Sequence, residues 1–404
     1  MMNGRMKYAI AKLGFILPYI ILPCCLGQEL LEGEFGDIKL GRELISPSRF
    51  PTVQEMRKMV AKPNMTTALM LRMYRDENNH HLPMWSPDGQ RLAFQRTNVE
   101  GATASKLLLY KTMSQPKPTL VTDREDTYDY MFRWGINSPQ GFVFSRIDKG
   151  RQSTNIFVST DGEEFQEQTA GAGQFIFPTL YERTDGIWRL IYQRDSDLVH
   201  DAWSGKGAVG EPSVIAQGTA PRWARDGQTV LMMRRRSATA SSGGHDLVVR
   251  NLQTQTEFVL PSPSRGTLRS PVWSPNERQV AYYAREPGEA SPWRIEVCNV
   301  QRGGAARVVG SDIVMNQAFH SEGPNWEPSG RRVWTFSHSK RKDAYYPLVA
   351  FDVATGDAAT VDYPTRCTSP SDLAVNPVTG VPEIAFVGHD GVTQDLFVVF
   401  LNHY

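Results

Sequence analysis

The sequence predicts an all-β protein, a seven-bladed β-propeller with four strands in each blade. Three observations lead to this prediction. A short motif with the pattern Pro-x-Trp recurs along the chain, a turn of the Ser-Pro-Asp-Gly type follows the tryptophan, and an apolar strand follows the turn. Repetition of such a strand–turn–strand unit every ~40–50 residues is typical of propellers and solenoids.

The repeat can be followed from residue 83 to the end of the chain. Its tryptophans are Trp85, Trp134, Trp223, Trp273 and Trp326, and the double-length gap after Trp134 leaves room for a copy without a tryptophan at this position. The seven copies are residues 83–94, 132–146, 177–194, 221–234, 271–285, 324–338 and 370–389. Seven copies predict seven blades.

The first copy, PMWSPDGQRLAF (83–94), shows how a blade begins. Pro-x-Trp starts the innermost strand, proline suits the second position of the turn and glycine its end. The segment RLAF then shows the two-residue alternation of a strand. We expect the third and fourth strands of this blade at 106–111 and 118–122, and the only helical periodicity lies in a short segment, 52–61.

The last copy predicts how the ring closes. It stops after its third strand, at 395–401, whereas an unassigned apolar segment, 68–74, precedes the first copy. Placing this segment as the outer strand of the last blade closes the ring and removes sheet edges that invite aggregation. We therefore expect a propeller domain over 67–404, preceded by an N-terminal extension with the short helix over 28–66.

The tryptophans and turn aspartates have a structural explanation. The tryptophans occupy one position of the innermost strands, where large aromatic side chains fill the gaps between blades. Asp88 lies in a Pro-Asp-Gly turn, where an aspartate shapes the turn through hydrogen bonds to the backbone. We therefore do not assign catalysis to either set.

Residues 1–27 differ from the rest of the chain. A basic start precedes the apolar run 13–26, which is too short and too interrupted by proline to span a membrane but suits a secretory signal. We expect cleavage after Gly27 and a periplasmic or secreted protein. Lipid anchoring through Cys24 or Cys25 is the alternative.

Composition narrows the remaining possibilities. The net charge of +1 and the ordinary charged content of 22% argue against a nucleic-acid partner. The chain has no second long apolar run, so we expect no transmembrane helix in the mature protein, and we expect that protein to be a monomer. Only Cys298 and Cys367 remain beyond the signal, too few for a disulfide framework, and whether they pair is open.

The copies resemble the TolB-like, WD-type β-propeller repeat, which runs roughly Pro-x-Trp-Ser-Pro-Asp-Gly-x-x-Ile-Ala-Phe. Residues 83–94 match it nearly throughout, and 271–282 and 324–336 match it less closely. The resemblance covers about 67–404. It implies the fold but little about function, because binding scaffolds, accessory domains of peptidases and lyases share this repeat.

A fainter resemblance is to oligogalacturonate lyases, which are seven-bladed propellers of similar length. In that family a histidine-rich stretch also precedes the first blade, as NNHHLPMW (78–85) does here, and histidines of the last blades hold a metal. The corresponding segment of this chain, TRCTSPSDLAV (365–375), has no histidine. This departure weakens the implied lyase chemistry.

A series of basic residues marks one face of the propeller. The second strands end in FQR, FSR, YQR, MMR, YAR, FSH and VGH, which places a cationic or titratable side chain at nearly the same position of every blade. A ring of this kind would focus positive potential at one channel mouth, and guanidinium groups suit carboxylate or phosphate ligands. The expected ligand-binding residues are Arg96, Arg146, Arg194, Arg234, Arg285, His338 and His389. Solvated side chains paired with loop carboxylates are the competing interpretation.

Two functions follow from this face. The first is a non-enzymatic scaffold that binds an envelope or secreted protein, or an acidic oligosaccharide. The second is a lyase that eliminates across a uronate with the help of a divalent metal, Mn or Ca. For the lyase, the candidate catalytic residues are His80, His81 and His320, and the candidate metal ligands are His80, His320 and Glu322. We favour the scaffold, which requires no cofactor.

Overall fold

The computed structural model describes residues 39–40, 43–44 and most of the chain from 69 to 401. The segments left out between 69 and 401 are 98–104, 116, 123, 149, 151–152, 170–172, 205–206, 237–243, 288–290, 314–322, 337–347, 362–372, 380–381 and 390–393. The described residues form strands and turns, with no helix among them. The predicted signal segment and the predicted helix at 52–61 lie outside the described residues.

The strands fall into units that follow the sequence repeat. Unit 1 consists of β4 (Asn79–Trp85), β5 (Leu92–Thr97), β6 (Ser105–Tyr110) and β7 (Thr119–Leu120). Unit 2 consists of β8 (Thr127–Trp134), β9 (Phe142–Asp148), β10 (Ser153–Ser159) and β11 (Gln166–Glu167). Unit 3 consists of β12 (Phe175–Glu182), β13 (Trp188–Arg194), β14 (Asp197–Ser204), β15 (Gly207–Ala208) and β16 (Ser213–Gln217).

Units 4 to 7 repeat the pattern. Unit 4 consists of β17 (Thr219–Trp223), β18 (Thr229–Arg235), β19 (His245–Asn251) and β20 (Glu257–Leu260). Unit 5 consists of β21 (Thr267–Trp273), β22 (Gln279–Arg285), β23 (Trp293–Asn299) and β24 (Ala306–Ile313). Unit 6 consists of β25 (Asn325–Trp326), β26 (Arg332–Phe336), β27 (Leu348–Asp352) and β28 (Ala358–Val361). Unit 7 consists of β29 (Leu373–Val375), β30 (Glu383–His389), β31 (Gln394–Phe400) and β3 (Leu69–Tyr74).

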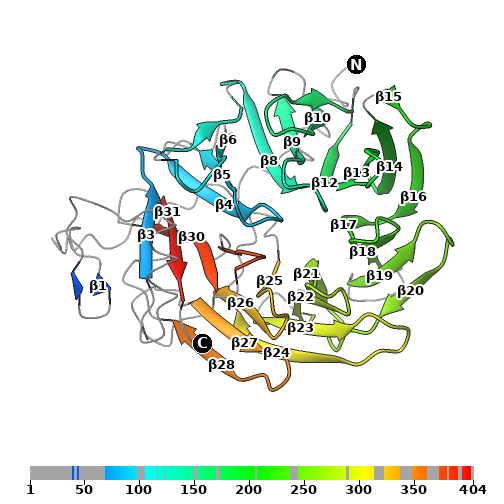
Figure 1. The fold of residues 1–404 in the computed structure, drawn as a ribbon. Coiled ribbons are helices and arrows are strands. Elements are labelled where there is room, and N and C mark those ends of the chain that lie inside the picture. The colour runs from blue at the N-terminus through cyan, green and yellow to red at the C-terminus, as the bar shows by residue number, and fades with distance from the viewer. Residues whose placement is uncertain are drawn as a thin grey trace, which may run out of the picture.

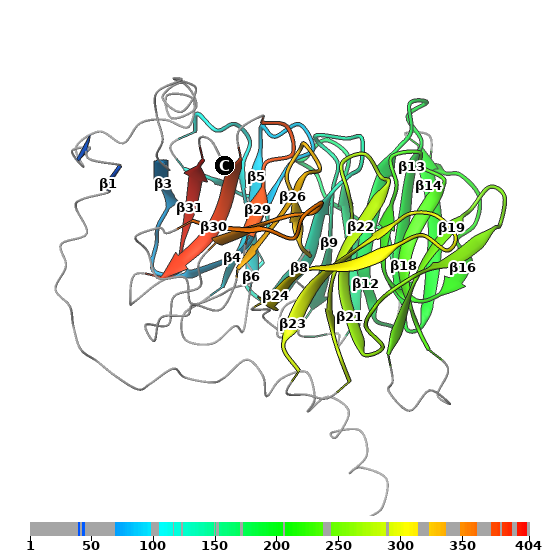
Figure 2. The ribbon, with the colours of Figure 1, turned by 90° about the horizontal axis from the view of Figure 1, so that it is seen from below.

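Within each unit the strands pair in an antiparallel manner, and in most units they follow chain order from the inside outwards. In unit 3 both β15 and β16 pair with β14, and unit 7 is completed by β3, which precedes the repeat. A single parallel bridge between β6 and β8 joins units 1 and 2. The first strands, β4, β8, β12, β17, β21, β25 and β29, lie toward a common centre, and the later strands lie toward the rim (Figure 1). Seen from the side, the sheets stand next to one another (Figure 2). The all-β propeller architecture predicted from the repeat is confirmed.

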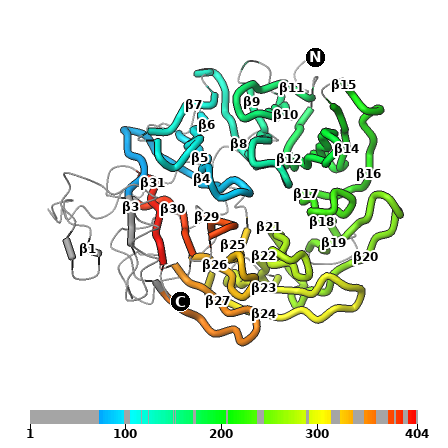
Figure 3. The backbone as a smooth tube through the Cα atoms, in the orientation of Figure 1, coloured from blue at the N-terminus to red at the C-terminus, as the bar shows by residue number. Residues whose placement is uncertain are grey.

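The strand that precedes the repeat in sequence lies beside the last strand. β3 pairs with β31 in an antiparallel register that runs from Leu69 opposite Phe400 to Tyr74 opposite Leu396. The backbone tube shows the two ends of the described propeller side by side (Figure 3). The remaining pair of short strands, β1 (Lys39–Leu40) and β2 (Glu43–Leu44), belongs to none of these units.

A β-bulge recurs in the innermost strands of units 1 to 5. The register slips just before the tryptophan position, in unit 1 between His81 and Met84. One residue of each bulge has a positive φ: Leu82, Met131, Phe177, Ala220 and Ser270, at 49°, 52°, 54°, 50° and 50°. Because the bulge leaves residues outside the ladder, a proline such as Pro83 fits there without removing a ladder hydrogen bond.

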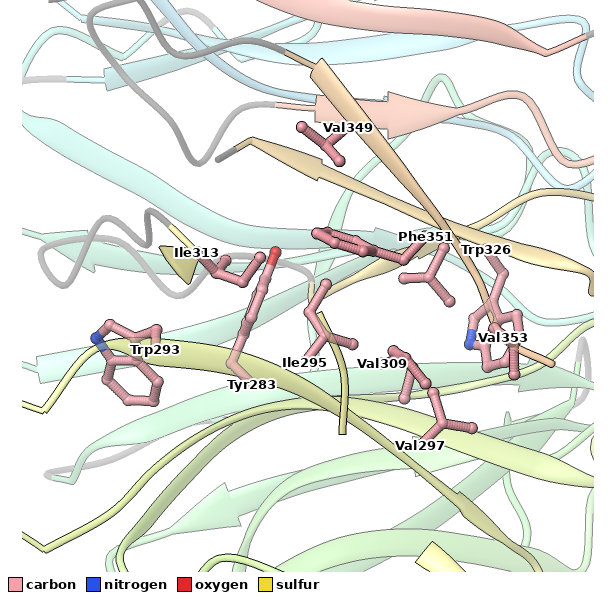
Figure 4. Packing of buried hydrophobic residues seen from close by; sticks show 12 residues of the cluster. Tyr283, Trp293, Ile295, Val297, Val309, Ile313, Trp326, Val349, Phe351 and Val353 are labelled. Atoms are coloured by element: carbon pink, nitrogen blue, oxygen red, sulfur yellow. The ribbon is translucent and has the colours of Figure 1, made fainter. Parts of the chain in front are cut away.

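The repeated tryptophans pack between units, as their structural interpretation requires. Trp134 of unit 2 is buried against Ala93, Leu107 and Leu109 of unit 1, and its indole nitrogen donates a hydrogen bond to the carbonyl of Met84 at 3.1 Å. Figure 4 shows the equivalent packing between units 5 and 6, where Trp326 belongs to a cluster with Ile295, Val297 and Phe351. Burial of such apolar surface contributes about 25 cal/mol per Å².

Candidate functional site at the ends of the second strands

Strand register brings the basic series to one face of the molecule. His80 lies opposite Arg96, Asp129 opposite Arg146, and Thr267 opposite Arg285, each pair being the start of a first strand and the end of a second strand. The Pro-Asp-Gly turns connect the opposite ends of the same strands. We call the face formed by the first-strand starts and second-strand ends the mouth.

At the mouth, unit 1 contacts unit 7 through a small polar network. His80 is fully buried, and its Nδ1 lies 2.6 Å from the carbonyl oxygen of Gln394. Its Nε2 lies 3.2 Å from a carboxylate oxygen of Asp76, whose other oxygen accepts a hydrogen bond from Arg96 at 3.2 Å. The ring of His80 also packs against Tyr74 and Phe94. This network ties the segment after β3 to the first and last units.

Asp76 is the charged centre of this network. Burial opposes its ionisation, but the contact with His80 and the hydrogen bond from the backbone amide of Asn78 outweigh that effect and hold its pKa well below the ordinary value. The carboxylate also acts on Tyr74, whose pKa is raised by burial and then by Asp76. Asp76 is therefore an anion in the folded protein at all ordinary pH values.

His81 occupies a different environment from its neighbour. It is only half-buried, and its Nε2 lies 3.0 Å from the hydroxyl of Thr97 at the end of β5. Successive residues of a strand point to opposite faces, so the two histidines diverge rather than form one chelating pair. His80 is held inside the fold, whereas His81 reaches the surface of the mouth.

The strand-end arginines divide into distinct environments. Arg146 is buried and makes two hydrogen bonds to Asp129, at 2.6 and 2.9 Å, while its guanidinium lies over the rings of Phe144 and Phe157. This fork-to-carboxylate geometry is the strongest form of the interaction. The guanidinium group of Arg146 is therefore bound by side chains of its own unit.

Arg234 forms the equivalent fork with Glu257 nearer the surface. Its two terminal nitrogens lie 2.7 and 2.9 Å from the Glu257 oxygens, and Arg250 adds a third contact at 3.0 Å. These hydrogen bonds, above all that of Arg234, lower the pKa of Glu257 to about 2. Arg250 lies opposite Val230, and Glu257 lies opposite Arg250. The Arg234 side chain therefore extends toward the turn end of the unit to reach this carboxylate.

Arg194 and Arg285 have surroundings that differ from those of Arg146 and Arg234. Arg194 is exposed at the end of β13. The guanidinium carbon of Arg285 lies 4.9 Å from the centre of the Trp293 ring, and that of Arg269, on β21, lies 5.9 Å from the same ring. Burial and then the nearby charge of Arg285 lower the pKa of Arg269. The fold thus holds two like charges near each other.

Several of the expected site residues cannot be placed. His320, Glu322 and His338 lie outside the described residues, and His389 ends β30 but its side chain is not described. Within the described part of the chain, no group of three His, Cys, Asp or Glu side chains is arranged to hold a metal ion. The proposed catalytic set of His80, His81 and His320 and the proposed metal set of His80, His320 and Glu322 therefore stay predictions.

Sequence reasoning allowed for pairing with loop carboxylates but did not identify the partners, and it missed Arg269. Asp76, Asp129 and Glu257 lie 20, 17 and 23 residues from Arg96, Arg146 and Arg234. A signal for Asp129 was present, because an antiparallel hairpin places the start of its first strand opposite the end of its second. Arg269 carries no signal beyond its position two residues before a Pro-x-Trp motif.

No family model and no curated protein matches this sequence. Solved structures do match its fold. An oligogalacturonate lyase in complex with manganese has a TM-score of 0.59 and 14% identity, over 84% of this chain and 95% of the lyase. The Cps50 (Swd1) β-propeller domain of Myceliophteria thermophila has a TM-score of 0.55 and 10% identity, over 82% of this chain and 99% of that domain.

A third similar structure is the hydrazine synthase of Kuenenia stuttgartiensis, with a TM-score of 0.52 and 12% identity over 78% of this chain and 94% of that one. The resemblance to TolB-like, WD-type propellers inferred from the repeat is therefore confirmed for the fold. At these identities the likeness extends to the fold alone. Among the described residues, no helix is long and apolar enough to cross a membrane.

Proposed function

We propose that this protein is an exported binding propeller, whose seven units are the blades of one closed ring and whose mouth binds an anionic ligand. The ligand is an acidic, carboxylate-bearing glycan or an acidic surface of an envelope or secreted protein. The signal-like segment 1–27 motivates the export, and pairing of β3 with β31 supports the closure.

One observation carries the binding proposal. Of the five strand-end arginines, which come from five successive units, Arg96, Arg194 and Arg285 retain solvent exposure at the mouth, Arg234 is partly exposed but paired with Glu257, and only Arg146 is buried. Cations from different blades that reach solvent at one mouth raise the local concentration of anions there. A purely structural role would bury them all, as it does Arg146.

The proposal is tested by binding of acidic oligosaccharides to the full chain at low salt. The double variant Arg194→Gln, Arg285→Gln removes two accessible cations and is expected to weaken binding about 10-fold or more, since a hydrogen bond to a charged group contributes ~1.5–3 kcal/mol. Arg183→Gln is the matched control, because Arg183 is an exposed cation in the turn at the opposite end of unit 3, paired with Asp185 at 2.8 Å.

Three results are informative. Loss of binding in the double variant but not in the control supports the proposal. An equal loss of binding in the double variant and in the control would mean that net charge alone accounts for the effect. Absence of binding to any acidic glycan or acidic protein by the unmodified chain would remove the proposal.

A lyase is the second candidate, and the placement of His81 favours it. This histidine is half-buried at the mouth, where it could accept a proton from a bound uronate. The reaction would produce an unsaturated sugar that absorbs in the ultraviolet when the protein is mixed with oligogalacturonate and Mn or Ca. His81→Ala is expected to abolish that signal. No absorbance change with either metal excludes the lyase and leaves the binding proposal intact.

A further inference from the structure

A cluster of cationic side chains lies at the mouth where unit 4 meets unit 5. We call Arg235, His245, Arg269 and Arg285 the basic cluster. Arg235 and His245 are direct cross-strand neighbours in unit 4, at the end of β18 and the start of β19. Arg269 and Arg285 lie against the single ring of Trp293 in unit 5. Four cationic or titratable groups thus come from two adjacent sheets.

Two glycines allow close backbone approaches beside the cluster, Gly244 between the two units and Gly266 within unit 5. A Cβ atom at Gly244 would lie 2.6 Å from the carbonyl oxygen of Gly266, and one at Gly266 would lie 2.3 Å from that of Arg285. Real side chains do not tolerate such distances, so the close approach depends on glycine at both positions. The side chains of the basic cluster are therefore attached to backbone segments that contact one another directly.

Arg236 joins the two units and pairs with Asp246, the acid next to His245 in the chain. Its Nε donates to Asp246 at 2.6 Å, and its terminal nitrogen donates to the backbone carbonyl of Arg265 at 2.8 Å. The pKa of His245 is lowered by burial and then by the positive charges of Arg235, Arg269 and Arg236, whereas the carboxylate of Asp246 raises it. The charge of Arg269 is thus felt across the boundary between the two units.

We propose that the basic cluster is a binding site for a tetrahedral oxyanion, the phosphate or sulfate group of a ligand bound at the mouth. A carboxylate offers one negative charge and two oxygens in a plane, which matches a single guanidinium fork. Three guanidinium groups and an imidazole match a tetrahedral group with three free oxygens, which carries one negative charge as a sulfate ester and up to two as a phosphate ester. The partial exposure of all four side chains gives such a group access from solvent.

This inference rests on the proposed function and narrows it, since it predicts a phosphorylated or sulfated ligand rather than one with carboxylates alone. Inorganic phosphate and sulfate serve as probes, with galacturonate as the singly charged comparison, in calorimetric titrations of the full chain. We expect the two dianions to bind at least 10-fold more tightly than galacturonate. Galactose 6-phosphate and galactose 6-sulfate then distinguish the two sources of the group.

Variants test the residues. Arg269→Gln and Arg285→Gln are each expected to weaken dianion binding about 10-fold or more, and Arg269→Lys less. The matched control is Arg278→Gln, because Arg278 is an exposed arginine of the same unit at the opposite face. Circular dichroism shows whether each variant folds. If Arg269→Gln does not fold, the effect of Arg285→Gln on dianion binding alone tests the proposal.

The outcomes separate the two proposals. Dianion binding that is unchanged in both cluster variants, or that is no tighter than galacturonate binding, overturns the cluster as an oxyanion site. If the dianions do not bind but an acidic glycan does, the inference fails and the proposed function stands. If nothing anionic binds, both fail.

Discussion

Arg146 and Asp129 form a two-point ion pair within the sheet of unit 2. The Nε and Nη2 atoms of Arg146 lie 2.6 and 2.9 Å from the two oxygens of Asp129, and the carboxylate is fully buried. The pair lies at the same register position that leaves Arg194 exposed in unit 3. One repeated sequence position therefore serves stability in one unit and solvent contact in the next.

Replacing Arg146 is expected to destabilise the protein strongly. Arg146→Ala leaves the buried Asp129 carboxylate without its partner, which typically costs about 3–5 kcal/mol. Arg194→Ala, at the equivalent exposed position, is expected to change the free energy of unfolding by less than about 0.5 kcal/mol. Urea unfolding measures both values. Similar changes in unfolding free energy for the two variants would show that the ion pair contributes no more stability than an exposed arginine does.

Acid is expected to weaken the junction between units 1 and 7. The folded-state pKa of Asp76 is depressed, so its ion pairs contribute their full stability above the unfolded value of 3.8, and this contribution declines as the pH falls from there toward the lower folded-state pKa. Asp76→Asn lacks the titrating group. The difference in unfolding free energy between the unmodified protein and Asp76→Asn, about 1–3 kcal/mol at pH 7, is therefore expected to shrink between pH 5 and pH 3. A difference that is constant with pH would contradict this assignment.

The thiol of Cys298 is expected to be unreactive in the folded protein. Cys298 is fully buried in the cluster between units 4 and 5, and burial, followed by the charge of Glu296, raises its pKa to about 12. Only the thiolate is nucleophilic, so alkylation at pH 8 requires unfolding. Peptide-resolved mass spectrometry after iodoacetamide treatment, with and without urea, measures the protection. Labelling of Cys298 at equal rates in both conditions would refute it.

The repeat made the architecture predictable because strand, turn and tryptophan positions recur at a nearly fixed spacing. The candidate site was predictable only in part. Sequence located the strand-end arginines on one face, but it did not separate Arg146 from Arg194. That difference depends on the residue opposite each arginine, which is Asp129 for Arg146 and Phe175 for Arg194. Both units share the bulge and its register, so the repeat predicts where the arginines lie but not which side chain faces each of them.

The turn face offers a test that separates backbone conformation from packing. Gly89 has a φ of 64°, and a Cβ atom there would lie 2.3 Å from the Oδ1 of Asn376 in unit 7. Asn376 is buried, donates a hydrogen bond to the Gly89 carbonyl at 3.0 Å and accepts one from the amide of Val378, so it cannot move aside without losing both. Gly186, in the turn of unit 3, has a φ of 76°, and a Cβ atom there would meet no other atom within 4 Å.

Gly186→Ala is therefore expected to cost only the left-handed backbone penalty, about 1–2 kcal/mol. Gly89→Ala is expected to cost that amount and a further ~1–3 kcal/mol for the clash and its repair. Urea unfolding gives both values, and their difference reports the contact between the first and last units. Equal costs would mean that Asn376 yields freely, and that the turn of unit 1 is not fastened to unit 7 at this point.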